Sequence, residues 1–153
     1  MPTKKLTTWI LIADGYRARI LKNEGAGTGL TPATDQQFKN PNVHGYSRDL
    51  KSDRPGRAFG TAGSARHAME PHHDYHVYEK HLFAKSMAKV LNEAALRKAF
   101  DRLILVAPPK TLGELRAELA EATSALVAGE INKDLTRTPD PDLPAHLSDV
   151  LRL

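Results

Sequence analysis

Residues Thr7 to Leu21 read TTWILIADGYRARIL, and this stretch decides how the fold begins. Thr7 to Ala13 place apolar residues at successive positions, which is typical of a strand covered on both faces. Arg17 to Leu21 alternate polar with apolar residues, which is typical of a second strand. Asp14-Gly15 between them is a strong signal for a tight turn. We therefore expect the two strands to form an antiparallel hairpin.

The middle of the chain predicts a weak strand, a long connection and a long helix. The strand is expected around Ala33 to Phe38, after a glycine-rich turn region. Helical patterning begins near Asp74, a residue type suited to an N-cap, and continues to about Phe100. The apolar face of this helix is formed by Phe83, Met87, Val90, Leu91 and Ala94.

The last third of the chain alternates strands with helices. Arg102 to Ala107 form a buried strand that Pro108-Pro109 must end, because proline cannot donate to a strand ladder. Thr111 and Glu114 have the spacing of a capping box at the start of a helix. A last strand is expected within Leu126 to Leu135, and a short helix from about Asp142 to Leu151. This order predicts an α/β protein: a three-layer α/β/α sandwich on a mixed five-stranded sheet with strand 2 antiparallel.

Composition limits the kinds of protein that this chain can be. Its 153 residues, 41% of them hydrophobic, suit a single domain spanning residues 1–153. The chain has no cysteine, which excludes disulfides and thiolate metal sites. The longest strongly apolar run is Trp9 to Ala13, too short for a membrane span, and the first residues lack the pattern of a secretory signal. We expect a cytoplasmic protein.

A long basic connection, Lys39 to His73, is the first candidate for function. Between Lys39 and His67 six cations oppose two acids, so this part carries the equivalent of the net charge of +4. Gly56 to His81 hold five of the seven histidines and three of the ten glycines. We expect the connection to be exposed and more mobile than the sheet, and its charge suits an anionic partner such as RNA. A solvated loop without a partner is the alternative.

Three residues in this connection have the chemistry of a nucleophile, a base and an orienting acid. They are Ser64, His67 and Glu70, but no strand-turn-helix elbow surrounds the serine. His72 and His76 have the spacing of neighbouring metal ligands on a helix, although no complete metal motif is present. Histidines that face solvent are the simpler interpretation. We therefore predict no catalytic residue and no cofactor.

Four blocks in order along the chain carry a resemblance to a known family. They are WILIADGYRARIL, SDRPGRAFGTAGSARHAMEP, LILVAPPKTLGELR and EINKDLTRTP, and they resemble the bacterial host attachment protein family. That family is in turn similar to the middle domain of archaeo-eukaryotic release factors and Pelota. The resemblance implies an RNase H-like fold with strand order 3-2-1-4-5. The family name describes a phenotype, so it leaves the biochemical activity open.

The resemblance also implies a site. In release factors a Gly-Gly-Gln loop precedes a long helix and positions the water that cleaves peptidyl-tRNA. Here Gly60 to Ser64, GTAGS, occupy the equivalent place, but the only glutamines of the chain are Gln36 and Gln37. The absence of the loop glutamine argues against peptidyl-tRNA hydrolysis.

We therefore expect a non-catalytic binder of RNA or the ribosome. The residues expected to contact nucleic acid are Arg54, Arg57, Gly60, Gly63, Ser64, Arg66 and His67. One alternative is a small hydrolase that uses Ser64, His67 or a histidine-bound metal. Another is a protein-interaction module with an indirect role in attachment to host cells.

Two further features have a structural and a functional interpretation. Glu130, Lys133 and Asp134 match the last family block and are candidates for a polar cluster at the end of the last strand, with a surface or strand-capping role as the simpler interpretation. Trp9 has apolar neighbours, so we expect it in the core rather than on a base-stacking surface.

Overall fold

The computed structural model describes residues 6–34, 37–40 and 62–151, and for residues 62–75 it describes the backbone alone. The hairpin expected at the start of the chain is present. β1 (Thr8–Ala13) pairs antiparallel with β2 (Arg17–Asn23). Oδ1 of Asp14 accepts hydrogen bonds from the backbone N–H groups of Tyr16 and Arg17, at 2.7 and 2.8 Å. Asp14 therefore closes the turn with its own side chain, as its position indicated.

The expected parallel strands complete a mixed sheet. β5 (Arg102–Val106) lies parallel to β1, and β6 (Val127–Ile131) lies parallel to β5. A long helix, α2 (Ala62–Leu96), precedes β5. The crossover from β5 to β6 contains α3 (Pro109–Glu118) and a further short helix, α4 (Glu121–Ser124). The chain is thus a mixed α/β protein, as predicted.

The third strand of the prediction is wrong in detail. In place of one strand over Ala33 to Phe38, the structure has two short strands, β3 (Thr31–Pro32) and β4 (Phe38–Lys39), each antiparallel to β2. Pro32 has no N–H to give to a ladder, which limits the length of β3. Within the described residues the sheet has six strands, in the order β3-β2-β1-β5-β6, with β4 as a second partner of β2.

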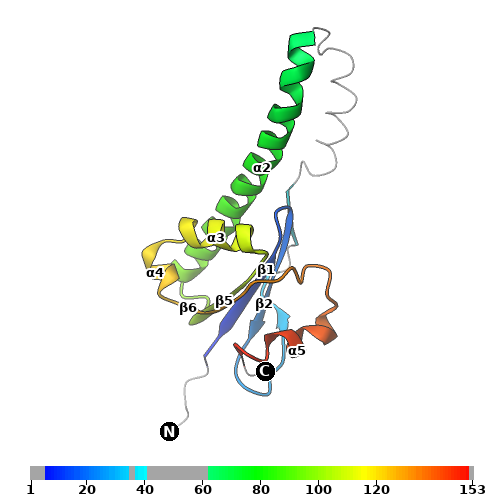
Figure 1. Ribbon diagram of the computed structural model, residues 1–153. Helices are drawn as coiled ribbons and strands as arrows, with labels where there is room; N and C mark the ends of the chain where they lie inside the picture. Colours follow the sequence, from blue (N-terminus) through cyan, green and yellow to red (C-terminus); the bar gives the residue numbers. More distant parts are fainter. Residues whose placement is uncertain (1–5, 35–36, 41–61, 152–153) are drawn as a thin grey trace.

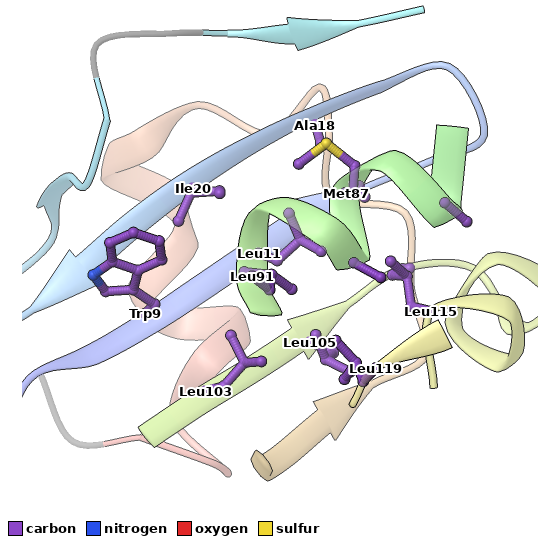
Figure 2. Close-up of a cluster of buried hydrophobic side chains, with 14 of the residues drawn as sticks. Trp9, Leu11, Ala18, Ile20, Met87, Leu91, Leu103, Leu105, Leu115 and Leu119 are labelled. Atoms are coloured by element: carbon purple, nitrogen blue, oxygen red, sulfur yellow. The ribbon is translucent and has the colours of Figure 1, made fainter. Parts of the chain in front are cut away.

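Alternate residues of β1 face opposite sides of the sheet, and each side has its own apolar cluster. Trp9 and Leu11 belong to the cluster that α2 and α3 cover, and Figure 2 shows Leu11 beside Leu91 of α2. The Trp9 ring lies 5.1 Å from that of Phe100, centroid to centroid, so Trp9 is a core residue as expected.

The opposite side of the sheet is covered by the end of the described chain. Ile10 and Ile12 pack there with residues of α5 (Leu143–Leu147), which follows a 3-10 turn, η1 (Asp140–Asp142). Figure 1 shows α5 across the sheet from α2 and α3. The last helix is shorter than the expected Asp142 to Leu151. It begins one residue later, because Asp142 belongs to the 3-10 turn, and it ends at Leu147.

The long helix begins earlier than its sequence pattern indicated. α2 starts at Ala62 rather than at Asp74, so the part of the expected loop from residue 62 to residue 73 is helical. Alanine has the highest helix propensity, and Ala62, Ala65 and Ala68 support this extension. It passes through Pro71, a residue with no N–H to donate to the preceding turn. No helix among the described residues is long and apolar enough to cross a membrane.

The end of α2 and the start of α3 differ from the sequence-based expectation. α2 ends at Leu96 rather than near Phe100, because Lys98 adopts a left-handed conformation with φ of 58°. The capping box predicted at Thr111 and Glu114 is wrong. Proline at the first helical position starts α3 instead, since its fixed φ suits a helix and its missing N–H needs no partner there.

Candidate nucleic-acid interface

The residues expected to contact nucleic acid fall into two groups. Arg54, Arg57 and Gly60 lie outside the described residues. The others lie in the first part of α2, where only the backbone is described; they are Gly63, Ser64, Arg66 and His67. Figure 1 shows this part of α2 extending well beyond the sheet. Gly63 and Ser64 therefore belong to a helix and not to the loop that was expected at their position.

The histidines do not define a metal site in the described chain. His72 lies where only the backbone is described, and His76 is half-buried on α2. No group of three histidine, aspartate or glutamate side chains that could hold a metal comes together among the described residues. His81 lies between two carboxylates of α3, 3.9 Å from Glu114 and 3.8 Å from Glu118. These contacts link α2 to α3 across their interface.

The polar residues of the last family block also have separate partners. Glu130 accepts two hydrogen bonds from the Arg116 guanidinium, at 3.0 and 2.7 Å. These bonds hold the pKa of the Glu130 carboxyl below its usual value of 4.5. Asp134 accepts a hydrogen bond from the backbone N–H of Thr136, and Lys133 is exposed. The three residues therefore have structural or surface positions and form no common cluster.

A different set of cations meets where β2 and β4 pair. We call Arg17, Arg19 and Lys39 the basic strand edge. Arg17 and Lys39 are directly opposite each other in the antiparallel register, so their side chains leave the same face of the sheet. Together with Thr136 these cations line a hollow of about 230 Å³.

The three cations of the basic strand edge are neutralised to different degrees. Arg19 is held by Asp140, at 2.7 Å, and by the backbone carbonyls of Leu135 and Thr138. The Nε of Arg19 is buried and has no hydrogen-bond partner among the described residues. Nε of Arg17 lies 3.5 Å from an oxygen of Asp14.

Lys39 has no ion pair within the described part of the chain. Like charges placed opposite each other on neighbouring strands repel. The pair that Lys39 forms with Arg17 is therefore the electrostatically least satisfied part of the basic strand edge.

Asn40, the residue after Lys39, is held by hydrogen bonds to the β1–β2 turn and to α2. The backbone N–H of Asn40 donates to the carbonyl of Tyr16 at 2.7 Å, and its side-chain amide donates to Glu79 of α2 at 3.0 Å. Burial raises the pKa of the Tyr16 phenol, and the carboxylates of Asp14 and Glu79 raise it further. A groove of about 540 Å³ runs beside these residues, between β4 and α2. The position of Lys39 relative to the sheet is thus set by two defined hydrogen bonds.

No sequence pattern pointed directly to the basic strand edge. Arg17 and Arg19 were visible as the polar positions of an alternating strand. Their proximity to Lys39 depends on the pairing of β4 with β2, and the expected strand over Ala33 to Phe38 stopped one residue short of it. The charge count from Lys39 onward was the one available signal.

The fold and the basic strand edge together define a class of protein. It is an α/β protein with a mixed sheet, helices on both faces and a cationic edge where a basic connection leaves the sheet. The chain belongs to the family described as "Protein required for attachment to host cells", whose model matches residues 9–147. A comparison with curated proteins gives no match. The family description names a phenotype and leaves the chemistry to be inferred from the site.

Proposed function

We propose that this protein is a non-catalytic RNA-binding protein of the cytoplasm, which contacts RNA free or in the ribosome. The observation that carries the proposal is the cross-strand pair of Arg17 and Lys39. A phosphate between the two cations offsets the repulsion that their pairing creates. Arg19 also lines this hollow and adds a third cation to it. Phosphate contacts of this kind supply affinity without reading the base sequence.

The basic connection extends this interface along the sequence. It starts at Lys39, and from there to His67 its excess of cations equals the net charge of the whole chain, +4. Arg54, Arg57 and Arg66 are the cations that we assign to further phosphate contacts. Gly60, Gly63, Ser64 and His67 are assigned to close approach of the backbone and to hydrogen bonds with the RNA.

The proposed relation to release-factor middle domains agrees with this function. An RNase H-like domain of that kind needs a central strand flanked by one antiparallel and one parallel partner. β1 lies between β2 and β5 in that way, which supports the proposal. The long helix α2, which begins within the glycine-containing block, is a second feature that supports the proposal. The chain lacks the loop glutamine, so the proposal is for binding rather than hydrolysis.

Binding without catalysis also agrees with the helical backbone around the candidate nucleophile. Ser64, His67 and Glu70 all lie on α2 at intervals of three residues, and Ser64 is within the first turn of this helix. Attachment to host cells is then an indirect result of regulation through RNA or the ribosome. The alternative is a protein-interaction module with the same phenotype. The RNA-binding experiment distinguishes this alternative from our proposal.

The experiment compares the affinity for RNA at several salt concentrations. Fluorescence anisotropy with a labelled single-stranded oligoribonucleotide is measured for the full chain and for Arg17→Ala/Lys39→Ala. Each phosphate contact that is lost should reduce the log-log salt slope by about 0.7. The matched control is Lys110→Ala/Lys133→Ala, which removes the same charge from exposed positions elsewhere. Equal slopes for the two double variants would exclude the basic strand edge as the interface.

A second set of variants tests the connection and the hydrolase alternative. Arg54→Ala/Arg57→Ala/Arg66→Ala should weaken cosedimentation with ribosomes while leaving the free energy of unfolding within about 0.5 kcal/mol. Ser64→Ala and His67→Ala should act only as modest binding variants. Hydrolysis of peptidyl-tRNA, an ester or a phosphodiester that either substitution or a chelator abolishes would replace our proposal with the hydrolase.

A further inference from the structure

The outward side of α2 carries large apolar side chains that are exposed and are not part of the core. Four large hydrophobic residues are exposed in the described part of the chain, and three of them are on α2. Tyr78, Leu82 and Leu96 expose 56, 39 and 80% of their surface. The inward side of the same helix is buried in the core, and these three residues lie outside that buried cluster.

The two exposed leucines lie on one line along the helix with two lysines. Leu82, Lys85, Lys89 and Leu96 are separated by three, four and seven positions, which places them on one face. We call this line, together with Glu93 beside it, the outer ridge. The ridge borders a groove of about 460 Å³. It is hydrophobic at its two ends and charged in the middle.

The outer ridge is complementary to itself in the reverse direction. When it is read from either end, the order is leucine, charged residues and leucine, with Lys89 at the centre. A second α2 placed antiparallel, with the two-fold axis at Lys89, sets Leu82 opposite the partner's Leu96. The same register sets Lys85 opposite the partner's Glu93, so opposite charges meet on both sides of the axis.

We propose that the outer ridge is a homodimer interface in which the α2 helices of two copies pack antiparallel about Lys89. An isologous interface requires a surface that is complementary to itself under two-fold rotation, and the outer ridge has this property. The two lysines at the axis are flanked by Glu93 and by Glu118, which lines the same groove. These carboxylates offset the repulsion between the lysines.

The charge balance favours a second copy over RNA on this side of α2. Lys85 and Lys89 are matched by Glu93 and Glu118 around the groove, so it presents no excess of cations to phosphate. The hollow at the basic strand edge and the groove beside the outer ridge have no lining residue in common, so the two surfaces are separate. The dimer therefore does not depend on the proposed RNA binding, and each can fail without the other.

Charge reversal tests the register directly. The molar mass of the full chain is measured by sedimentation over a range of concentrations for Lys85→Glu, Glu93→Lys and the double variant. Each single change places like charges across the interface and should weaken the dimer about tenfold or more, whereas the double change restores opposite charges. Residues 85 and 93 are two turns apart on one helix, beyond the reach of an intrahelical pair, so restoration must come from the partner.

A crosslink tests the axis without relying on affinity. The chain has no cysteine, so Lys89→Cys introduces a single thiol at the proposed two-fold axis. Oxidation, or a short bis-maleimide, should link two copies of this variant and leave the control Lys133→Cys mostly unlinked. Circular dichroism confirms that each variant is folded. A monomer at all concentrations, failure of the double variant to recover, or equal crosslinking of both thiols would overturn the proposal.

Discussion

The side chain of Lys80 on α2 lies directly over Gly15 in the turn between β1 and β2. A Cβ added at Gly15 would come within 2.6 Å of Cγ and 2.8 Å of Cδ of Lys80. The Lys80 ammonium then reaches the ring of Tyr16, at 5.2 Å from its centroid. The turn and the long helix are therefore joined through a contact that needs the smallest residue at position 15.

Gly15→Ala should destabilise the protein by about 1 to 2 kcal/mol, because the new methyl group must displace the stem of Lys80. The free energy of unfolding from urea titrations measures the effect. In a Lys80→Ala background the same change should cost less than about 0.5 kcal/mol, since the opposing atoms are gone.

Gly113→Ala is the matched control for Gly15→Ala. A Cβ at Gly113 meets nothing within 4 Å, and this residue lies within α3. The substitution should therefore stabilise the protein by about 0.5 to 1 kcal/mol through helix propensity. A cost at Gly15 that persists without Lys80 would show that the contact is not the cause.

The elements that could be read from the sequence are those fixed by local chemistry. The pattern of Trp9 to Ala13 predicted a covered strand and Asp14-Gly15 predicted a turn, and both are present. Pro108 and Pro109 had to follow a strand end, and β5 does end at Val106. In each case neighbouring residues alone determine the backbone, so no knowledge of the rest of the fold was needed.

The elements that were missed depend on contacts between distant residues. β4 is two residues long and exists because Phe38 and Lys39 pair with β2. The basic strand edge follows from that pairing, so the sequence could show its charges but not their arrangement. The left-handed conformation of Lys98 was hidden for a related reason, since lysine rarely adopts it and glycine would have been the expected signal.

Lys98→Gly should stabilise the protein by about 0.5 to 1 kcal/mol, because glycine adopts a positive φ without a steric cost. The turn after α2 holds this conformation through two hydrogen bonds, from the N–H of Lys98 to the Ala95 carbonyl at 3.0 Å and from the N–H of Ala99 to the Ala94 carbonyl at 2.9 Å. Thermal and urea unfolding measure the gain. Lys98→Ala keeps the Cβ and should change stability by less than about 0.5 kcal/mol, so an equal gain from alanine would point to charge instead of backbone strain.

Arg19→Ala should destabilise the protein by about 1 to 3 kcal/mol, because it removes the side-chain donors that tie β2 to the segment before α5. Arg19 donates to Asp140 and to the carbonyls of Leu135 and Thr138. Hydrogen exchange at the Thr138 amide should accelerate as that segment loosens.

Arg19→Lys keeps the charge but lacks the forked guanidinium, so it should recover less than half of the loss. Lys22→Ala, which removes a cation from the same strand, is the control and should have little effect because its pair with Glu24 is largely exposed. Full recovery by lysine would mean that charge alone, rather than the geometry of the donors, holds the segment.

The pair of Arg116 and Glu130 should make stability depend on pH in the acidic range. The hydrogen bonds from Arg116 lower the folded-state pKa of Glu130 below its value of 4.5 in the unfolded chain. A lowered pKa means that the folded state binds the proton more weakly, so the contribution is complete above the unfolded value and is lost as the pH falls through the folded one. Both side chains are partly exposed, so we expect a small effect.

Arg116→Gln should therefore lower the thermal midpoint by a constant amount near neutral pH, and the difference from the unchanged protein should shrink as the pH falls below 4.5. Lys133→Gln removes the same charge from an exposed position and should show no such convergence. The carboxyl carbon of Glu130, followed by NMR, should titrate at a higher pH in Arg116→Gln than in the unchanged protein. An identical titration midpoint in the two proteins would mean that Arg116 does not stabilise the Glu130 carboxylate in solution, and the pH dependence would then have to come from other groups.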